Sequence, residues 1–253
     1  MAKRAKRAIK NNPREERNSS DYKNKRNSNV ISVDFQPKTV KKIDIVPRSL
    51  NQEDMLMALE DDSKPVVIAS GPAGSGKTYI ASLYAVKQLI EGKIKKIVLT
   101  RPNVAVDDRD IGFLPGDIIE KMLPWLGGIM DALELYYSKQ EIQKLLEDGK
   151  IECLPVAFCR GRSLADCIVI LDEAQGTTAN SILAVLTRIS SNSKLVIAGD
   201  TKQSDRGDSN GLADLIDRLE YNPINGIEHI QFTRKDIQRH PIISHILKLY
   251  GQD

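Results

Sequence analysis

Hydrophobic residues along this 253-residue chain gather in short continuous runs, and the segments between the runs show the spacing of amphipathic helices. A continuous apolar run is typical of a strand that is buried on both faces, because a half-exposed strand would alternate apolar and polar residues. The pattern predicts six strands, at residues 66–69, 96–100, 151–156, 168–171, 195–198 and 227–232.

Helical stretches are predicted around and between these runs. They lie at residues 51–59, 78–91, 117–121, 128–137, 139–146, 180–189, 211–220 and 242–249. A chain that alternates strands with helices usually forms a parallel sheet that is covered by helices on both faces. The sequence therefore predicts an α/β fold, a three-layer sandwich with a mostly parallel central sheet.

The first predicted strand runs directly into a phosphate-binding pattern, G-x-x-x-x-G-K-[ST]. The pattern comprises Gly71, Pro72, Ala73, Gly74, Ser75, Gly76, Lys77 and Thr78. In such a loop the backbone N–H groups point at the β-phosphate, the lysine reaches the β- and γ-phosphates, and the hydroxyl ligates Mg²⁺. Since the required strand, loop and helix are all predicted, the sequence indicates a site for a nucleoside triphosphate and Mg²⁺.

An acidic pair, Asp172 and Glu173, ends the apolar run at residues 167–171. Alone, such a pair is more often the start of a solvated loop, but its position after a phosphate-binding loop favours a catalytic role. We expect Asp172 to hold the metal and Glu173 to polarise the attacking water.

Two glutamines complete the expected site. Gln52 precedes the loop at the distance where helicase-like ATPases place a glutamine that reads adenine. Gln203 lies just past a later predicted strand, where its amide can donate to the γ-phosphate and orient the water. Each signal is weak by itself, because Asn-Gln is a common helix start and Gly-Asp a common turn.

Charge is distributed unevenly along the chain. Residues 1–29 contain ten Lys or Arg and three Asp or Glu, a balance of +7, so the remainder carries −4 of the net +3. With few apolar residues this segment is expected to be a disordered basic tail, followed by a linker at 30–46 and the folded domain at 47–253. The tail either solubilises the protein or contacts nucleic-acid phosphates.

Other features narrow the class of protein. No run approaches the roughly twenty apolar residues of a membrane span, and the N-terminus is charged, so a soluble cytoplasmic protein without membrane contact is expected. Cys153, Cys159 and Cys167 lack the spacing of a zinc site and are expected to be buried thiols. The loop-rich segment at residues 100–126 is a candidate partner surface, and its aspartates are expected to form a solvated turn.

Several further motifs carry a family resemblance. They are T-R-P at 100–102, I-G-F-L-P-G-D at 111–117, R-G-R at 160–162, L-D-E-A-Q at 171–175 and R-H-P at 239–241. With them the chain, from about Pro47 to Tyr250, resembles the PhoH family of cytoplasmic ATPases. The chain departs from the family pattern at Gly176, where asparagine is expected, and its compact form suits a phage-encoded member.

The resemblance implies a RecA-like P-loop NTPase core related to superfamily 1 helicases, with ATP and Mg²⁺ as ligands. It also implies an association with phosphate starvation and with RNA metabolism. Contacts to single-stranded RNA or DNA are expected at the carboxyl ends of strands. The candidate residues are Thr100, Arg101, Arg160 and Arg162.

Hydrolysis leaves negative charge that ATPases usually neutralise with an arginine. The chain has no room for a second motor domain, so this arginine is expected from another copy in a ring or head-to-tail oligomer. Arg234 and Arg239 are the candidates, and they join Glu173, Gln203 and Lys77 in the expected catalytic set.

Three functions remain open from the sequence. The leading interpretation is an ATPase coupled to RNA or single-stranded DNA. The alternatives are a P-loop kinase or transferase that acts on a small acceptor, and a nucleotide-dependent regulatory scaffold with little turnover. The pairing of Glu173 with Gln203 favours water as the acceptor.

Overall fold

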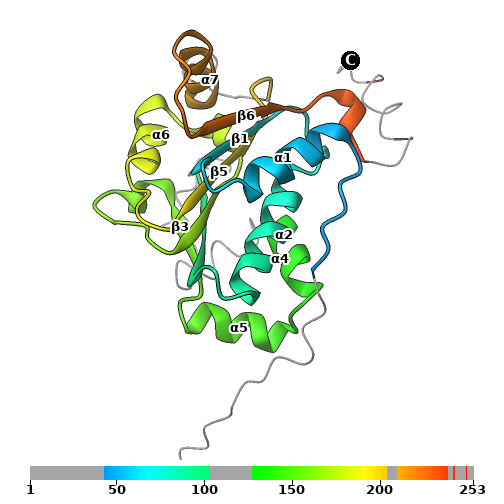
Figure 1. Ribbon diagram of the computed structural model, residues 1–253, viewed down its shortest axis with the longest axis vertical. Coiled ribbons are helices and arrows are strands. Elements are labelled where there is room, and N and C mark those ends of the chain that lie inside the picture. The colour runs from blue at the N-terminus through cyan, green and yellow to red at the C-terminus, as the bar shows by residue number, and fades with distance from the viewer. Residues whose placement is uncertain (1–42, 103–126, 204–209, 239–241, 243–248, 250–253) are drawn as a thin grey trace, which may run out of the picture. The chain divides into compact units, whose positions relative to one another are not determined.

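The computed structural model describes residues 43–102, 127–203 and 210–238, together with positions 242 and 249 (Figure 1). The chain divides into two units, Met1–Thr39 and Val40–Asp253, and all described residues belong to the second. The predicted basic tail, the acidic loop and the helices at 117–121 and 242–249 lie outside the described residues, apart from positions 242 and 249.

The second unit is built on one six-stranded sheet. Its strands are β1 (Val66–Ser70), β2 (Lys96–Arg101), β3 (Ile151–Pro155), β4 (Cys167–Leu171), β5 (Lys194–Gly199) and β6 (Ile227–Gln231). Their order is β3-β2-β4-β5-β1-β6, and every neighbouring pair is parallel. All six predicted strands are confirmed, and the carboxyl ends of all six lie at one edge of the sheet.

Helices cover both faces of this sheet. They are α1 (Leu50–Glu60), α2 (Lys77–Ile90), α4 (Gly127–Glu134), α5 (Lys139–Glu147), α6 (Ala179–Leu186) and α7 (Gly211–Tyr221), with short 3₁₀ turns η3 (Val156–Cys159), η4 (Ala174–Gly176) and η6 (Arg234–Asp236). None of the described helices is both long and apolar enough to cross a membrane.

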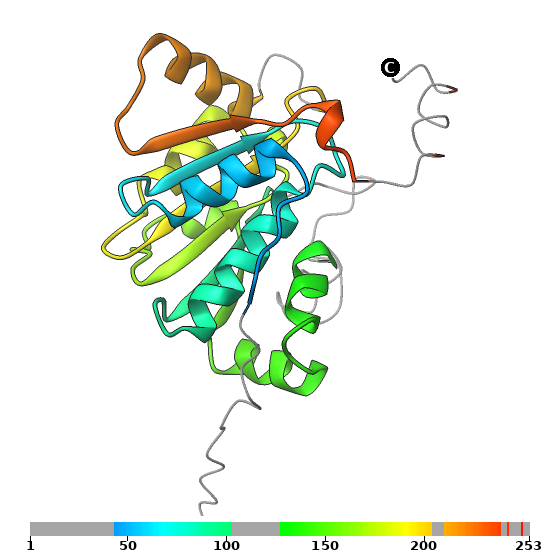
Figure 2. The same cartoon turned by 45° about the vertical axis from the view of Figure 1, so that its right-hand side comes forward.

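Two hydrophobic clusters separate the layers. One joins the sheet to α1, α2, α4 and α5, and the other joins the opposite face to α6, α7 and η3. In Figure 2 the blue helix α1 and the blue-green helix α2 lie on the near face of the sheet. The three-layer α/β sandwich is therefore confirmed, and the continuous apolar runs are explained by strands such as β1, β4 and β5, which are buried throughout. The three cysteines are free and buried, as expected.

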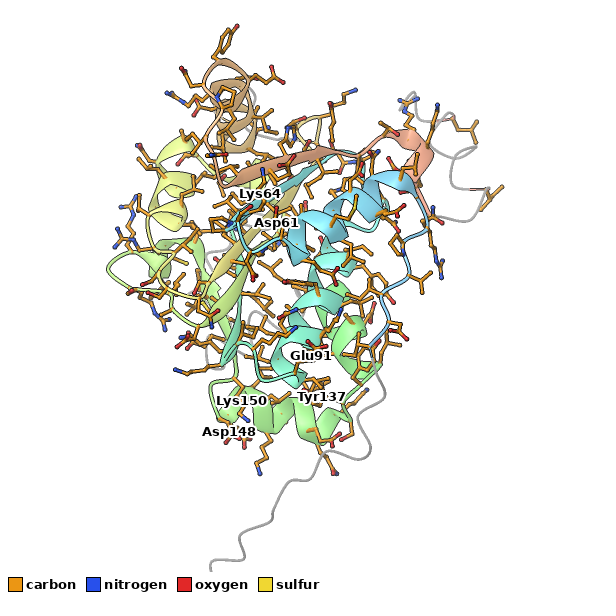
Figure 3. The ribbon with its side chains drawn as sticks, viewed as in Figure 1. Asp61, Lys64, Glu91, Tyr137, Asp148 and Lys150 are labelled. Atoms are coloured by element: carbon orange, nitrogen blue, oxygen red, sulfur yellow. The ribbon has the colours of Figure 1, made fainter. Side chains whose placement is uncertain are left out.

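Two lysines fix α1 and the following loop to the sheet. Lys194, at the start of β5, is buried and donates to the carbonyls of Leu59 (2.7 Å) and Asp61 (2.8 Å). The last carbonyls of a helix have no partner within it, so this ammonium closes the end of α1. Lys64, labelled in Figure 3, pairs with Glu228 of β6 at 2.7 Å. These contacts hold the end of α1 and the loop after it against β5 and β6.

Candidate active site

The phosphate-binding pattern folds as a loop between β1 and α2, ending where the helix begins at Lys77. Gly71 and Gly76 have φ values of 132° and 87°, which L side chains rarely adopt. A Cβ atom at Gly71 would lie 2.3 Å from the Phe232 carbonyl oxygen, and one at Gly76 would lie 2.7 Å from Gln52 Nε2. The backbone can follow this path only with glycine at both positions.

Lys77 is folded onto the loop that precedes it. Its Nζ donates to the carbonyl oxygens of Gly71 (2.7 Å) and Pro72 (2.9 Å), and it lies 3.2 Å from Ser75 Oγ. The side chain is buried, so the ammonium is held at the loop rather than in bulk water. A phosphate bound by the loop would meet this charge directly, as the sequence predicts.

Thr78 and Asp172 meet at the start of α2 and the end of β4. The Thr78 hydroxyl donates to Asp172 Oδ1 at 2.7 Å, and the Asp172 backbone N–H donates to the Thr100 carbonyl at 3.0 Å. Burial raises the pKa of Asp172, and the hydrogen bond from Thr78 opposes that change. A hydroxyl and a carboxylate oxygen side by side suit Mg²⁺, which takes few protein ligands and completes its shell with phosphates and water.

Glu173 follows at the same edge and has an unusual backbone conformation. Its φ of 52° is in the left-handed region, which costs a residue with a side chain roughly 1–3 kcal/mol and is concentrated at functional sites. Its carboxylate accepts from Gln175 Nε2 at 2.5 Å and pairs with Arg101 Nη2 at 3.4 Å. The expected catalytic carboxylate is thus held from two sides.

Gln175 contacts the candidate catalytic carboxylate, and the sequence interpretation did not single it out. Its side chain is buried, and its Oε1 accepts from the Asp200 backbone N–H at 3.0 Å while its Nε2 donates to Glu173. An added Cβ at Gly199 would lie 2.6 Å from this Oε1, so the end of β5 must pass close to it. The sequence signal that points to Gln175 is its position in the motif L-D-E-A-Q, two residues after Glu173.

Gln203 lies in the turn after β5. Its backbone N–H donates to the Asp200 carbonyl at 3.0 Å, and its side chain is exposed. The turn puts the residue at the carboxyl edge of the sheet, where Thr78 and Asp172 also lie. Its contact with the γ-phosphate stays a prediction.

Gln52 is buried against the phosphate-binding loop. Its Oε1 accepts from the Arg48 backbone N–H, and its Nε2 donates to the Ser75 carbonyl, both at 2.8 Å. Gln52 therefore braces the loop, which the sequence interpretation did not foresee. Adenine recognition by the remaining donor and acceptor capacity of this amide stays a prediction.

The segment after β6 braces the same loop. Asp236 is buried in η6 and accepts from Asn51 Nδ2 at 2.8 Å, and the backbone N–H of Gln238 donates to the Gly74 carbonyl at 3.0 Å. Arg234 is exposed at the start of η6, and Arg239 lies outside the described residues. Arg234 therefore lies in the segment that braces the phosphate-binding loop of its own chain. Whether Arg234 or Arg239 reaches a second copy of the chain stays a prediction.

The four residues expected to contact nucleic acid do not gather in one place. Thr100 is buried, and its hydroxyl lies 3.7 Å from Cys159 Sγ; its contact with nucleic acid stays a prediction. Arg101 reaches Glu173, as described above. Arg160 is exposed beside a cavity of about 340 Å³ that also includes Pro102.

Arg162 points elsewhere, toward the amino half of β3. It pairs with Glu152 at 2.7 Å, and Lys96 pairs with the same carboxylate at 2.8 Å. Burial alone would raise the pKa of Glu152, but the two cations hold it below its ordinary value. Arg162 is therefore engaged in an ion-pair network away from Arg101.

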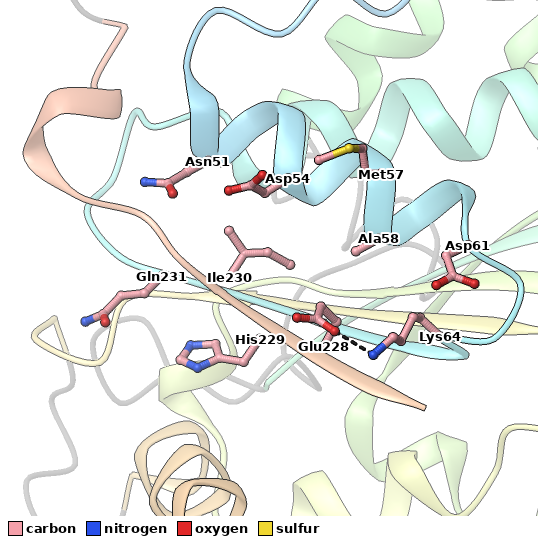
Figure 4. A pocket seen from close by; sticks show the side chains of 10 residues that line it. All are labelled: Asn51, Asp54, Met57, Ala58, Asp61, Lys64, Glu228, His229, Ile230 and Gln231. Atoms are coloured by element: carbon pink, nitrogen blue, oxygen red, sulfur yellow. Dashed lines mark hydrogen bonds and ion pairs between the residues drawn. The ribbon is translucent and has the colours of Figure 1, made fainter. Parts of the chain in front are cut away.

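A second cavity, of about 420 Å³, lies between α1 and β6 (Figure 4). The Lys64–Glu228 ion pair lines it, together with Asp54, Asp61 and His229. No residue of the phosphate-binding loop lines this cavity, and its carboxylates outnumber its lysine. It is therefore a poor site for a triphosphate.

Comparison with known proteins adds the family context. A sequence model of one family, described as PhoH-like protein, matches residues 44–251. A PhoH-like protein of Bacillus subtilis is 41% identical over 207 residues, which are 81% of this chain and 63% of the relative. A PhoH-like protein of Mycobacterium bovis is 39% identical over 225 residues, which are 88% of this chain and 62% of the relative. Protein PhoH of Escherichia coli is 37% identical over 211 residues, which are 82% of this chain and 58% of the relative. The chain spans less than two thirds of these curated relatives.

A solved structure supports the fold. The large terminase of bacteriophage HK97 superimposes with a TM-score of 0.54 at 15% identity, over 82% of this chain and 48% of that chain. At this identity the likeness concerns the fold alone.

Proposed function

The chain belongs to the PhoH-like protein family, and from this premise we propose that it binds ATP with Mg²⁺ and hydrolyses it. The observation that carries the proposal is the 2.7 Å hydrogen bond between Thr78 Oγ1 and Asp172 Oδ1, with Glu173 as the next residue. These groups lie at the end of a phosphate-binding loop, which is the arrangement that phosphoryl transfer to water requires.

Each residue has a distinct task in this proposal. The loop N–H groups and Lys77 bind the β- and γ-phosphates, and Thr78 with Asp172 holds Mg²⁺. The metal, when bound, neutralises charge that develops on the phosphate oxygens. Glu173 accepts a hydrogen bond from the attacking water, and Gln203 orients that water from the neighbouring strand end.

The first experiment separates hydrolysis from its alternatives. ATP and Mg²⁺ are incubated with the purified protein, and ADP and inorganic phosphate are measured together. A hydrolase releases the two in equal amounts, and Lys77→Ala abolishes both. ADP formed without phosphate when a small acceptor is added would favour the kinase or transferase alternative, and tight ATP binding without either product, with or without the acceptor, would favour the scaffold.

We also propose that hydrolysis is coupled to single-stranded RNA or DNA. Support comes from Arg101, which pairs with Glu173 at the carboxyl edge of the sheet, and from Arg160, which lines the cavity next to Pro102. The basic residues of the tail add charge for phosphate contacts. Binding through such contacts is electrostatic and weakly selective for sequence.

This coupling predicts a steep salt dependence. The affinity for a single-stranded oligonucleotide is expected to fall linearly on a log–log plot against salt, and deletion of residues 1–29 is expected to flatten the slope. The slope is measured by fluorescence anisotropy at several salt concentrations. A tail with its ten Lys and Arg replaced by Gln is the matched control and should behave like the deletion. A salt-independent affinity would contradict the prediction.

We propose that an arginine from a second copy of the chain neutralises the negative charge that hydrolysis leaves. Arg234 is exposed and Arg239 follows five residues later, so both are candidates. Arg234→Ala is expected to lower kcat about 10³-fold, the lower end of what such an arginine contributes. Mixing this variant with Glu173→Gln should restore turnover, because each inactive subunit supplies what the other lacks.

The mixing experiment has a matched control and a clear failure. Lys235→Ala changes the neighbouring exposed cation and should leave kcat nearly unchanged. The same mixing with Arg239→Ala decides between the two arginines. A monomer in sedimentation whose turnover persists at high dilution would refute the transfer of an arginine between copies.

Gln52→Ala is expected to raise the Kd for ATP roughly tenfold, because the Ser75 carbonyl loses its buried donor. If Gln52 also reads adenine, the ratio of the Kd values for GTP and ATP should fall toward one. Both constants are measured by calorimetry, with the exposed Gln143→Ala as control. An equal loss for ATP and GTP would leave Gln52 only its bracing role.

A further inference from the structure

The catalytic carboxylate is engaged on both oxygens. Glu173 Oε1 pairs with Arg101, and Oε2 accepts from the buried Gln175. A carboxylate accepts more strongly from water when fewer donors share its charge, so release of one of these partners would make Glu173 a better base. Gln175 is fixed by its second bond to Asp200, whereas the Arg101 pair is 3.4 Å long and partly solvated, with side chains 23% and 42% exposed.

An ion pair of this kind is weak. Partly exposed pairs contribute little because solvent screens the charges and ordering the side chains is costly. A guanidinium pairs well with a phosphate, which it can bind through two parallel hydrogen bonds. Arg101 can therefore exchange Glu173 for a phosphate at small cost.

A cavity near the end of β2, which Arg101 does not itself line, has the chemistry to bind that phosphate. It is formed where η3 and α6 pack together, and Pro102, the residue after Arg101, is part of its wall. Arg160 contributes a cation, and the hydroxyls of Thr178 and Ser181, which lie 3.0 Å apart, contribute polar groups. Cations and hydroxyls are the usual partners of nucleic-acid phosphates.

Two details distinguish this cavity from the one between α1 and β6. Among the described residues no carboxylate lines it, whereas Asp54, Asp61 and Glu228 line the other. Gly176 also lines it, and a Cβ at that position would lie 3.0 Å from Pro102 Cγ. The glycine that departs from the family pattern therefore keeps this wall open, next to the strand end that carries Arg101.

We propose that Arg101 is a positioning residue that couples nucleic acid to hydrolysis: a backbone phosphate of a single strand bound in the cavity draws its guanidinium from Glu173. The released carboxylate then accepts its hydrogen bond from water. The inference rests on the proposed ATPase function and assigns its regulation to one ion pair.

Competition between Glu173 and phosphate for one guanidinium has a reciprocal consequence. If phosphate binding weakens the Arg101–Glu173 pair, then loss of the Glu173 charge must strengthen phosphate binding by the same coupling. That gain must vanish when Arg101 is removed, because the two changes act through one contact. The effect is present without ATP and so can be measured without turnover.

The test is a double-mutant cycle on oligonucleotide affinity, with an RNA and a DNA of one sequence. Glu173→Gln is expected to tighten binding roughly two- to fivefold. Arg101→Ala is expected to weaken it, and the double variant should match Arg101→Ala. The exposed Glu147→Gln serves as the charge control. The inference would be overturned if Glu173→Gln does not raise the affinity, or if it raises it equally with and without Arg101. A gain in affinity for only the RNA or only the DNA identifies the kind of strand that binds.

Turnover provides the second readout. Without nucleic acid, Arg101→Ala should raise kcat several-fold at unchanged KM for ATP, and added oligonucleotide should no longer stimulate it; Arg101→Lys should retain part of the stimulation. A fall of kcat to the level of Glu173→Gln would mean that Arg101 orients Glu173 productively and would overturn the inference. If the unchanged chain hydrolyses no ATP, the proposed function fails, and the binding cycle alone still decides the competition.

Discussion

Glu173→Gln is expected to lower kcat for ATP hydrolysis by about 10²–10⁴-fold and to leave the Kd for ATP nearly unchanged. The amide keeps the size of the side chain but offers water a much poorer acceptor. Glu173 is not one of the two side chains that are expected to hold the metal, so ground-state binding should survive. Single-turnover phosphate release and calorimetric binding measure the two quantities separately.

Glu147→Gln is the matched control, since Glu147 is an exposed carboxylate at the end of α5. It should leave both constants unchanged. If Glu173→Gln retains full turnover, another group activates the water and Glu173 loses its assignment. If Glu173→Gln also abolishes ATP binding, then Glu173 contributes to binding of ATP in the ground state.

Asp172→Asn is expected to lower turnover about 10³-fold and to remove the dependence of ATP affinity on Mg²⁺. The neutral amide oxygen can still accept from Thr78, so the loop should keep its shape, but it is a poor ligand for a hard divalent cation. The Kd for ATP measured with Mg²⁺ and with excess chelator gives the dependence directly. Thr78→Val should give the same result from the other side of the site.

The thermal stability of Asp172→Asn distinguishes the loss of a metal ligand from misfolding. Because burial raises the pKa of Asp172 above its ordinary 3.8, the charged carboxylate costs the folded chain stability, which is lost as pH rises from 3.8 through the raised value. Asparagine carries no such charge, so the Tm of Asp172→Asn at neutral pH should not fall. Asp148→Asn, an exposed carboxylate labelled in Figure 3, is the control. Unchanged Mg²⁺ dependence would refute the metal site.

The sheet was predictable because its strands are parallel and buried on both faces. Such strands need continuous apolar runs, and β4 and β5 show them without interruption. Helix ends were less predictable. The helix expected at 128–137 ends at Glu134, and Tyr136 and Tyr137 both donate to the Leu133 carbonyl in a turn. This ending depends on local hydrogen bonds that the apolar pattern does not encode.

The phosphate-binding loop and the acidic pair were predictable because their spacing along the chain follows the chemistry of a triphosphate. The partners of these residues were not, since they depend on how strand ends meet in space. Thr100 and Arg101 are adjacent in the sequence, yet one is buried beside Cys159 and the other reaches Glu173. Successive side chains of a strand point to opposite faces of the sheet, so the two residues are expected on different faces. The sequence does not say which of these faces meets the catalytic carboxylate.

The most direct test of the account is the rate of ATP hydrolysis by the purified protein over a range of its concentration, with and without single-stranded RNA. Lys77→Ala and Glu173→Gln are run in parallel. For a nucleic-acid-coupled ATPase we expect turnover that rises with protein concentration and with RNA and that is lost in both variants. Turnover indifferent to RNA, or no turnover above the variants, would contradict a nucleic-acid-coupled ATPase.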